Sequence, residues 1–461
     1  MKRIRTWYWY TTAFLRKQWL TLIIVGVISI LLFHFLSSFI LANLPEGKTT
    51  RYIGRVGSIT LSRLPLDIQE KISDGLTTIG KDTTPLPALA ERWSVEDDGK
   101  TYRFVLKKNL KWQDGKTVVP SDISYNFSDA QVVTNQNEVV FKLKEPFSPF
   151  PTVVSQPIFR QKNNTIIGTG AYKVTQVLKD GPQVSQIAVE SNKEKLIYRF
   201  YPTEERAIIA FKLGQVDQLE NMSQVADLSD WKNVKINQTI RDDEYLAIFF
   251  NMSDTTLNKD MRQALNYALP KVHGDERALT PINSLSWAYN KTVKTYDQDD
   301  ERAVELMLRG IPGTPIVIEL TTTTNFQSDA EAIKSHWESM GNSAYLECTK
   351  TKAIVDKSGC INLKMQVNLR LVGFPDLSNF QVVLIGQEAP PDPDQYFLWD
   401  STQSTNFTQY KSPRIDKLLE DGRKQIDPEE RKNTYLDFQQ FLVEDTPAIF
   451  LRHLKVFSVM R

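Results

Sequence analysis

The side chains best suited to chemistry in this chain are acidic, whereas the residue that most often acts as a general base is scarce. Among 461 residues the four histidines are scattered, at His34, His273, His336 and His453. The chain has no glycine-rich phosphate loop, no His-Glu-x-x-His motif and no Gly-x-Ser-x-Gly turn. Adjacent acids such as Asp242-Asp243 are usually solvated on loops and do not by themselves indicate catalysis. We therefore expect no catalytic residues, no cofactor and a protein that is not an enzyme.

A second polar feature is the run Thr-Thr-Thr-Thr-Asn at residues 321–325. It follows a short apolar strand pattern at residues 316–320 and precedes a helix pattern that begins at residue 327. Backbone amides at the start of a helix can hold an anion or a carboxylate. Thr323, Thr324 and Asn325 are therefore candidates for contact with such a group.

Charge is distributed unevenly along the chain. Five Lys and Arg residues precede the first acidic residue, Glu46, so of the net charge of +1 the remainder of the chain carries −4. A mildly acidic body disfavours nucleic acid as a partner, because nucleic-acid binding needs a basic face.

The N-terminal segment has the features of a membrane anchor. Residues 19–40 are predominantly apolar, and as a helix they would span about 33 Å, against about 30 Å for a hydrocarbon core. The basic residues before them predict a cytoplasmic segment at residues 1–18 and a body outside the cell membrane. The alternative is a cleaved signal peptide, whose apolar region is usually shorter and ends in small residues, whereas Ile40 is bulky. We predict an uncleaved single-pass anchor at residues 19–42.

The two cysteines, Cys348 and Cys360, flank a short loop. Outside the cytoplasm such a pair favours a disulfide that closes a hairpin, with two free thiols as the alternative. Two cysteines with no neighbouring histidine cannot complete a tetrahedral shell, so we predict no metal site.

Strand and helix patterns alternate through the body, which predicts an α/β fold. Helices are predicted at residues 204–213, 259–269, 327–340, 413–424 and 428–444, and strands at residues 137–143, 245–251, 316–320 and 448–451. For the third helix, Ser328 and Glu331 form a capping-box pattern, and Gly341 is the expected end. Pro120-Ser121-Asp122 is a helix-entry signal.

The most informative stretch is LPALAERWSVEDDGKTYRFVLKKNLKWQDGKTVVPSDISYNF, at residues 86–127. Asp98-Gly99 and Asp114-Gly115 are turn signals on either side of an alternating strand. Together with Gly-Thr-Gly-Ala-Tyr at residues 168–172 and Gly-Gln-Val-Asp at residues 214–217, this order resembles the family 5 extracellular solute-binding proteins, the dipeptide and oligopeptide receptors of ABC importers. The resemblance covers roughly residues 86–461.

The resemblance implies a two-lobed, periplasmic-binding-protein-like (type II) fold with an extra N-terminal subdomain. We place lobe I at residues 46–247, with the subdomain at about 80–164 and in a shortened form, and lobe II at residues 248–447. Residues 448–461 return to lobe I. The hinge is expected where strands at residues 246–250 and 449–451 cross between the lobes.

The resemblance also implies an acidic ligand motif, which here reads IGQEAPPDPD at residues 385–394. The acid that pairs with a peptide's ammonium group in the family falls on Ala389, and the neighbouring Glu388 is the expected substitute. Asp392 and Asp394 either contact the solute or form a turn that caps the next helix. Trp399 either stacks on the solute or belongs to the core. The full set of predicted ligand-binding residues is Glu388, Asp392, Asp394, Trp399, Asn251, Thr323, Thr324 and Asn325.

These features predict a monomeric, membrane-tethered receptor that captures a peptide, or a similar extended solute, between two lobes. Its expected partners are an ABC permease and its ATPase subunits. The alternative on the same fold is a tethered solute sensor or a peptide-binding chaperone, since fold alone does not fix function.

Overall fold

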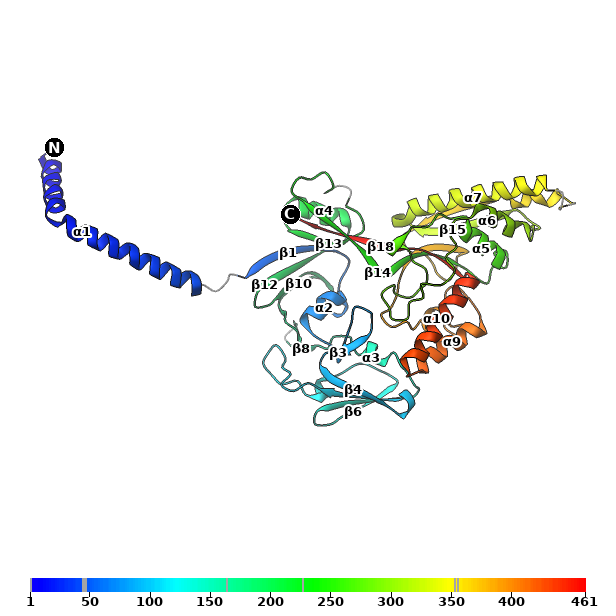
Figure 1. Ribbon diagram of the computed structural model, residues 1–461, viewed down its shortest axis with the longest axis horizontal. Helices are drawn as coiled ribbons and strands as arrows, with labels where there is room; N and C mark the ends of the chain where they lie inside the picture. The colour runs from blue at the N-terminus through cyan, green and yellow to red at the C-terminus, as the bar shows by residue number, and fades with distance from the viewer. Residues whose placement is uncertain (1, 44–47, 163–164, 226–227, 352–353, 355) are drawn as a thin grey trace.

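The computed structural model describes residues 2–43, 48–162, 165–225, 228–351, 354 and 356–461 (Figure 1). The helices are α1 (Lys2–Asn43), α2 (Leu66–Ile72), α3 (Phe150–Val153), α4 (Glu204–Lys212), α5 (Lys259–Tyr267), α6 (Asp300–Leu308), α7 (Gln327–Lys350), α8 (Tyr396–Trp399), α9 (Pro413–Lys424) and α10 (Pro428–Asp445). The strands are β1 (Thr49–Val56), β2 (Thr77–Ile79), β3 (Pro85–Pro87), β4 (Ala90–Glu96), β5 (Thr101–Leu106), β6 (Ala130–Thr134), β7 (Glu138–Leu143), β8 (Arg160–Lys162), β9 (Thr165–Ile167), β10 (Lys173–Asp180), β11 (Gln183–Glu190), β12 (Glu194–Tyr201), β13 (Gln218–Met222), β14 (Lys235–Phe250), β15 (Ile316–Thr323), β16 (Met365–Val372), β17 (Val382–Glu388) and β18 (Ala448–Met460).

A ten-stranded sheet runs through the body in the order β10-β11-β12-β1-β13-β18-β14-β17-β15-β16. The strands before β18 in this order belong to one half of the molecule, and those after β14 belong to the other. The long antiparallel pair β14–β18 joins the halves, with register shifts between Arg241 and Tyr245 and between Leu246 and Ala247. Because such shifts bend a strand and increase its twist, the pair is bent where it crosses from one half to the other.

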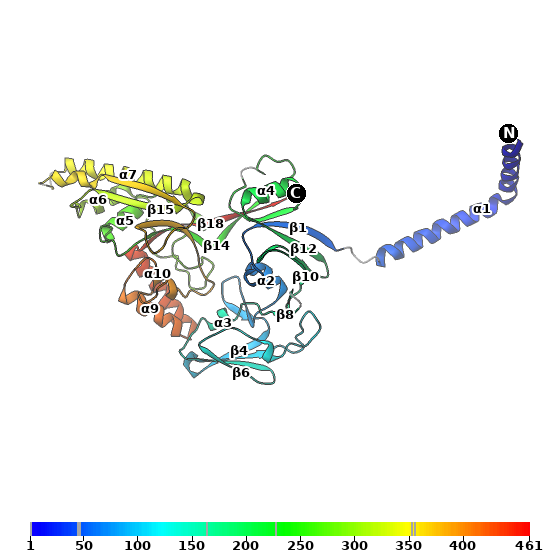
Figure 2. The same cartoon turned by 180° about the vertical axis from the view of Figure 1, so that it is seen from behind.

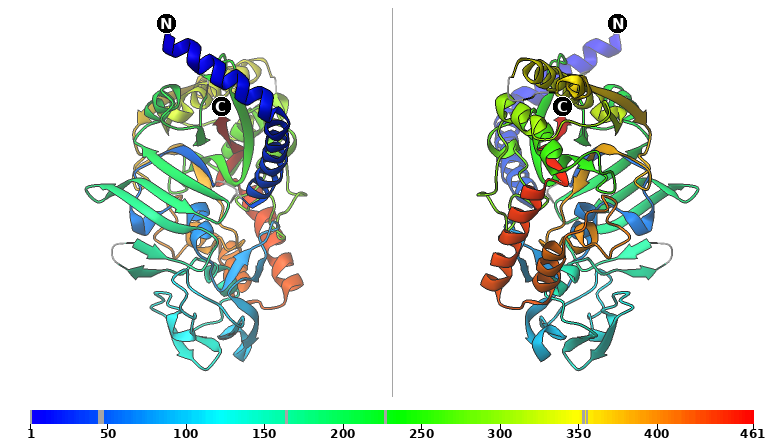
Figure 3. Two further views of the ribbon diagram at one scale, coloured as in Figure 1. Left: turned by 90° about the vertical axis from the view of Figure 1, so that its left-hand side faces the viewer. Right: turned by 90° about the vertical axis from the view of Figure 1, so that its right-hand side faces the viewer.

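We refer to the halves as lobe I and lobe II. In lobe II, α5, α6 and α7 cover one face of the sheet, and α9 and α10 cover the other (Figures 1 and 2). In lobe I, one core lies between α2 and strands β1 and β10–β12, and another lies under α4. A separate four-stranded sheet, β4-β5-β7-β6, has its own aromatic core and forms a subdomain. The subdomain lies at the end of the body opposite the chain's C-terminus (Figure 3).

Local sequence signals account for many of the helix boundaries. The Thr203 side chain caps α4 by accepting from the Arg206 amide, and Asp427 caps α10 by accepting from the Glu429 and Glu430 amides. Helix α9 covers the predicted residues, and α10 extends one residue beyond its prediction. These helices and the predicted strands at residues 245–251 and 316–320 are confirmed.

Four sequence expectations are corrected. Helix α7 does not end at Gly341 but continues to Lys350, and its N-cap position is Phe326 rather than a residue of the predicted capping box. Gly341 instead permits close packing, since a Cβ there would lie 2.7 Å from the Met365 backbone nitrogen. The entry signal at Pro120 leads only to a three-residue 3₁₀ turn, and the strand predicted at residues 448–451 extends to Met460.

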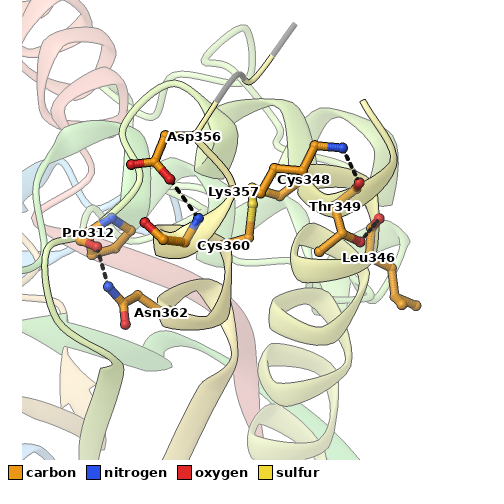
Figure 4. The surroundings of a disulfide bond; sticks show 9 residues. Pro312, Leu346, Cys348, Thr349, Asp356, Lys357, Cys360 and Asn362 are labelled. Atoms are coloured by element: carbon orange, nitrogen blue, oxygen red, sulfur yellow. Dashed lines mark hydrogen bonds between the residues drawn. A yellow bond between two sulfur atoms is a disulfide. The ribbon is translucent and has the colours of Figure 1, made fainter. Parts of the chain in front are cut away.

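The Cys348–Cys360 disulfide is confirmed, but it does not close a hairpin. It joins the last turns of α7 to a 3₁₀ segment, Ser358–Leu363, that leads into β16 (Figure 4). Nearby, the Asn362 side-chain amide donates to the Pro312 carbonyl at 2.9 Å. The bond therefore fixes the outer end of lobe II.

Helix α1 extends away from the body and is bent (Figures 1 and 2). Within the described residues no single helix meets the length and hydropathy requirements of a membrane span. The paired segments Trp7–Thr21 and Ile23–Leu36, which meet at 59°, meet them together.

Candidate ligand-binding site

A cavity with a volume of about 820 Å³ lies where the subdomain faces α8 and α9. We call it the aromatic cavity. Its lining is Asn126, Phe127, Ser128, Asp129, Ala130, Leu143, Lys144, Glu145, Pro146, Phe147, Phe150, Val153, Tyr396, Phe397, Glu420, Arg423 and Lys424. The first twelve residues belong to the subdomain and the last five to lobe II. The cavity therefore lies between the lobes.

Arg423, near the end of α9, connects the two sides of this cavity. Its guanidinium carbon lies 4.3 Å from the Tyr396 ring centroid, 5.3 Å from that of Phe397 and 4.9 Å from that of Phe147. Cation–π contacts of this kind favour a fixed position for the charge. The Arg423 carbonyl also accepts from the Ser148 amide at 2.7 Å, so the subdomain and α9 are in contact.

The predicted acids Asp392 and Asp394 lie just behind this cavity, and arginines already occupy their carboxylates. Asp392 accepts from Arg431 at 2.6 and 3.0 Å, and this pair is buried. Asp394 lies 3.2 Å from the Arg423 Nε atom and accepts from the Tyr396 amide, so it also forms the turn that precedes α8. Burial raises the pKa of Asp394 to about 6, although Arg423 lowers it. The turn alternative therefore describes both residues better than direct solute contact.

The charges of the Asp392–Arg431 pair also act on Tyr102 of the subdomain. The Tyr102 side chain of β5 donates from its hydroxyl to the Phe147 carbonyl at 3.0 Å. Burial raises the pKa of Tyr102 to about 12, and the charges of Arg431 and Asp392 act on it as well. A second contact between the lobes joins the Trp287 amide to the Asp82 carbonyl at 3.1 Å. The lobes thus touch both where Ser148 meets Arg423 and where Asp82 meets Trp287.

A smaller cavity of about 310 Å³ lies at the edge of β17, and we call it the acidic cavity. Its lining is Glu244, Thr323, Phe326, Ile385, Gly386, Gln387, Glu388 and Leu454. Glu244 and Glu388 are directly opposite each other on β14 and β17. Burial raises the pKa of Glu244, with Arg241 opposing the shift and with Asp243 and Glu388 adding to it. Arg241 already pairs with Glu244, since its Nη2 atom lies 3.0 Å from the Glu244 Oε1 atom, so Glu388 is the carboxylate of this pair that suits a further cationic group.

The remaining predicted residues are dispersed. Thr324 and Asn325 are exposed in the turn before α7, beside the acidic cavity's Thr323. Asn251 is half-buried and donates to the Phe380 carbonyl at 2.9 Å. Trp399 has no exposed surface and packs against Phe249, which agrees with the core alternative and leaves no surface for stacking on a solute.

The structure therefore divides the predicted residues between two faces of the lobe II sheet. Glu388 and Thr323 lie on the α7 face, with Phe326 and Leu454, whereas Trp399 belongs to the core under α9 and α10. Asp392 and Asp394 pair with α10 and α9 on that second face.

Sequence reasoning missed Arg423 and Arg431, because each meets its acid from a helix about thirty to forty residues farther along the chain and no local motif marks them. No cluster of three or more His, Cys, Asp or Glu side chains suited to a metal occurs in the part of the chain that is described.

Comparison with known proteins gives a consistent result. Residues 84–409 match the family of bacterial extracellular solute-binding proteins, family 5. The di/tripeptide-binding protein 1 of Pseudomonas aeruginosa is 24% identical, with 82% of each chain covered. The dipeptide-binding protein DppE of Bacillus subtilis is 41% identical over 80 residues, 17% of this chain and 14% of that protein.

Solved structures share the fold. NikZ from Campylobacter jejuni, in complex with Ni(L-His), has a TM-score of 0.68 at 23% identity, and 90% of this chain and 94% of that chain are covered. The oligopeptide-binding protein AppA from Bacillus subtilis, in complex with a nonapeptide, has a TM-score of 0.64 at 19% identity, with 90% and 95% covered. These similarities confirm the two-lobed, type II periplasmic-binding-protein fold. With the family match over most of the body, they show that this chain belongs to the bacterial extracellular solute-binding proteins, family 5.

Proposed function

We propose that this protein is the membrane-tethered, peptide-binding receptor of an ABC-type importer. The observation that carries the proposal is the family match over residues 84–409, on a body whose two lobes are joined by β14 and β18. Relatives named for dipeptides, tripeptides and oligopeptides support peptides as the solute. The receptor binds and releases its solute without turnover and as a monomer.

In this proposal the lobes alternate between separated and closed arrangements, and a peptide that contacts both of them favours the closed one. Lobe I comprises residues 46–247 and lobe II residues 248–447, and residues 448–461 return to lobe I. The bent part of the β14–β18 pair is the hinge about which the lobes move between the separated and closed arrangements. Closure then presents an occupied receptor to the permease, and ATP hydrolysis belongs to a separate subunit.

The acidic cavity is the proposed site for a cationic end of the solute. Glu388 supplies the carboxylate, because Glu244 beside it already pairs with Arg241, and Thr323 belongs to the same lining. Thr324 and Asn325 follow Thr323 in the turn before α7, and Asn251 follows β14 in lobe II. Asp392 and Asp394 pair with arginines on the opposite face of the sheet. A charge-assisted contact with an ammonium group is worth about 1.5–3 kcal/mol.

Helix α1 is the proposed anchor, with residues 1–18 in the cytoplasm and residues 19–42 in the membrane. Its exposed aromatic residues near the N-terminus, Trp7 to Tyr10, suit the interface between lipid and water. Alkaline extraction of membranes tests this assignment. The full chain should stay with the membrane fraction, and its recovery in the supernatant would contradict the anchor.

Calorimetric titration of the detergent-solubilised full chain tests the solute. Di-, tri- and octapeptides are compared with nickel–histidine and with a disaccharide. We expect heat of binding and a raised melting temperature with at least one peptide class, because a ligand at one hundred times its Kd adds about 2.7 kcal/mol of stability. If only nickel–histidine or the sugar binds, the peptide assignment is wrong.

A further inference from the structure

The aromatic cavity has the size and lining of a binding subsite. Its volume of about 820 Å³ lies within the range of roughly 300–1,000 Å³ that is typical of small-molecule sites. Phe127, Phe147, Phe150, Tyr396 and Phe397 supply aromatic surface from both lobes. Phe397 remains 59% exposed, with the Tyr396 ring centroid 6.1 Å from its own. Exposed aromatic surface at this position is available to an apolar group.

The charged residues of the lining restrict what that group can be. Three acids, Asp129, Glu145 and Glu420, are balanced by three bases. Lys144 pairs with Asp129, and Lys424 pairs with Glu420 at 3.7 Å. A balanced lining disfavours a polyanion and favours a solute of low net charge.

Arg423 is the one basic residue of this lining whose terminal nitrogens are uncommitted within the described part of the chain. The Arg423 Nε atom lies 3.2 Å from the Asp394 carboxylate, and Arg423 Nη1 and Nη2 donate no hydrogen bond within the described residues. The three rings around the guanidinium hold it in place. A guanidinium fixed in this way presents paired N–H donors, a geometry that matches a carboxylate.

We propose that the aromatic cavity is the subsite for the C-terminal residue of a bound peptide, and that it selects a large apolar side chain next to a free carboxylate. The side chain packs between Phe127 and Phe397, and Arg423 donates to the carboxylate. This assignment rests on the proposed peptide-binding function. Because residues of both lobes line the cavity, a peptide that fills it also favours the contact between the subdomain and α9.

The test is calorimetric titration of the full chain with Ala-Ala-Phe, Ala-Ala-Phe-amide and Ala-Ala-Gly. We expect wild-type protein to bind Ala-Ala-Phe at least tenfold more tightly than either of the others, a difference of about 1.4 kcal/mol. Phe397→Ala should weaken Ala-Ala-Phe about tenfold and leave Ala-Ala-Gly within twofold. Arg423→Lys should reduce the preference for carboxylate over amide, because lysine lacks the paired donors.

Phe374→Ala is the matched control, since Phe374 is 95% exposed on the turn after β16 and does not line the cavity. It should bind all three peptides as the wild type does. Equal affinity of wild-type protein for the three peptides, or equal losses for all three in Phe397→Ala, would overturn the subsite. Absence of binding to every peptide, including the longer ones, would instead overturn the proposed function. The Phe397 variant keeps the test informative if Arg423→Lys fails to fold.

Discussion

Asp392 and Arg431 illustrate at the residue scale how lobe II fixes the loop that carries the acidic motif. Both side chains are buried, and each carboxylate oxygen of Asp392 accepts from a different Arg431 nitrogen. A buried charge is tolerated only while its partner is present, because the remaining group cannot regain its hydration. The pair therefore has a structural role, and the solute must find its own contacts elsewhere.

We expect Asp392→Ala to lower the free energy of unfolding by about 3–5 kcal/mol, because it leaves the Arg431 charge buried and unpaired. Urea denaturation of the full chain measures this. The control is Asp129→Ala, whose carboxylate pairs with Lys144 at the surface and is 72% exposed, and which should leave stability nearly unchanged. Equal small effects for the two variants would show that the Asp392 pair is not the buried anchor described here.

Asp394 gives a prediction about pH. Its folded pKa of about 6 lies above the ordinary value of 3.8, so the folded state holds this proton more tightly than the unfolded state does. The protonated carboxyl therefore stabilises the folded state below about pH 4, and this contribution to the free energy of unfolding is lost as the pH rises through about 6. The contribution is roughly 3 kcal/mol, because the pKa differs by about two units between the folded and unfolded states. The stability of wild type relative to Asp394→Asn should therefore fall between pH 4 and pH 6.5. Parallel stability–pH curves for the two proteins would contradict the raised pKa.

At the scale of the element, the sequence predicted those helices whose caps and apolar faces are local. Thr203 and Asp427 cap α4 and α10 within three residues of themselves, so pattern and structure agree. The prediction of a helix end at Gly341 is wrong, because this glycine is required by its close contact with Met365 of β16 and not by neighbouring residues. Likewise, the acids at residues 392 and 394 were visible in the sequence, whereas their arginine partners depend on how α9 and α10 pack.

Gly341→Ala tests the packing explanation for α7. Alanine favours a helix over glycine by about 1 kcal/mol, so the change would stabilise an open helix surface. Here the new Cβ would lie 2.7 Å from both the Met365 nitrogen and its Cβ, and overpacking of this kind typically costs about 1–3 kcal/mol. We expect a lower melting temperature in differential scanning calorimetry. Ser343→Ala, at an exposed position of the same helix, should show no loss. A stabilised Gly341 variant would contradict the close contact with β16.

At the scale of the whole molecule, the resemblance over roughly residues 86–461 predicted the fold class, which the comparisons confirm. The arrangement of the site was beyond sequence reasoning, because it depends on which residues the two lobes bring together. Ser148 and Arg423 are more than 270 residues apart in the chain but share a hydrogen bond, and the aromatic cavity exists only where their elements meet. The β14–β18 pair joins the two lobes that carry these elements.

The central claim is that a solute closes the two lobes on each other about β14 and β18. Double electron–electron resonance between spin labels at Lys100→Cys and Glu429→Cys measures it most directly. Both positions are exposed, and they lie on either side of the contact where Gly99 approaches Ile426. The native cysteines are joined in a disulfide and take no label. With a saturating peptide we predict that a broad distance distribution shifts to a single short distance. An unchanged distribution, under conditions where calorimetry shows the same peptide bound, would contradict closure.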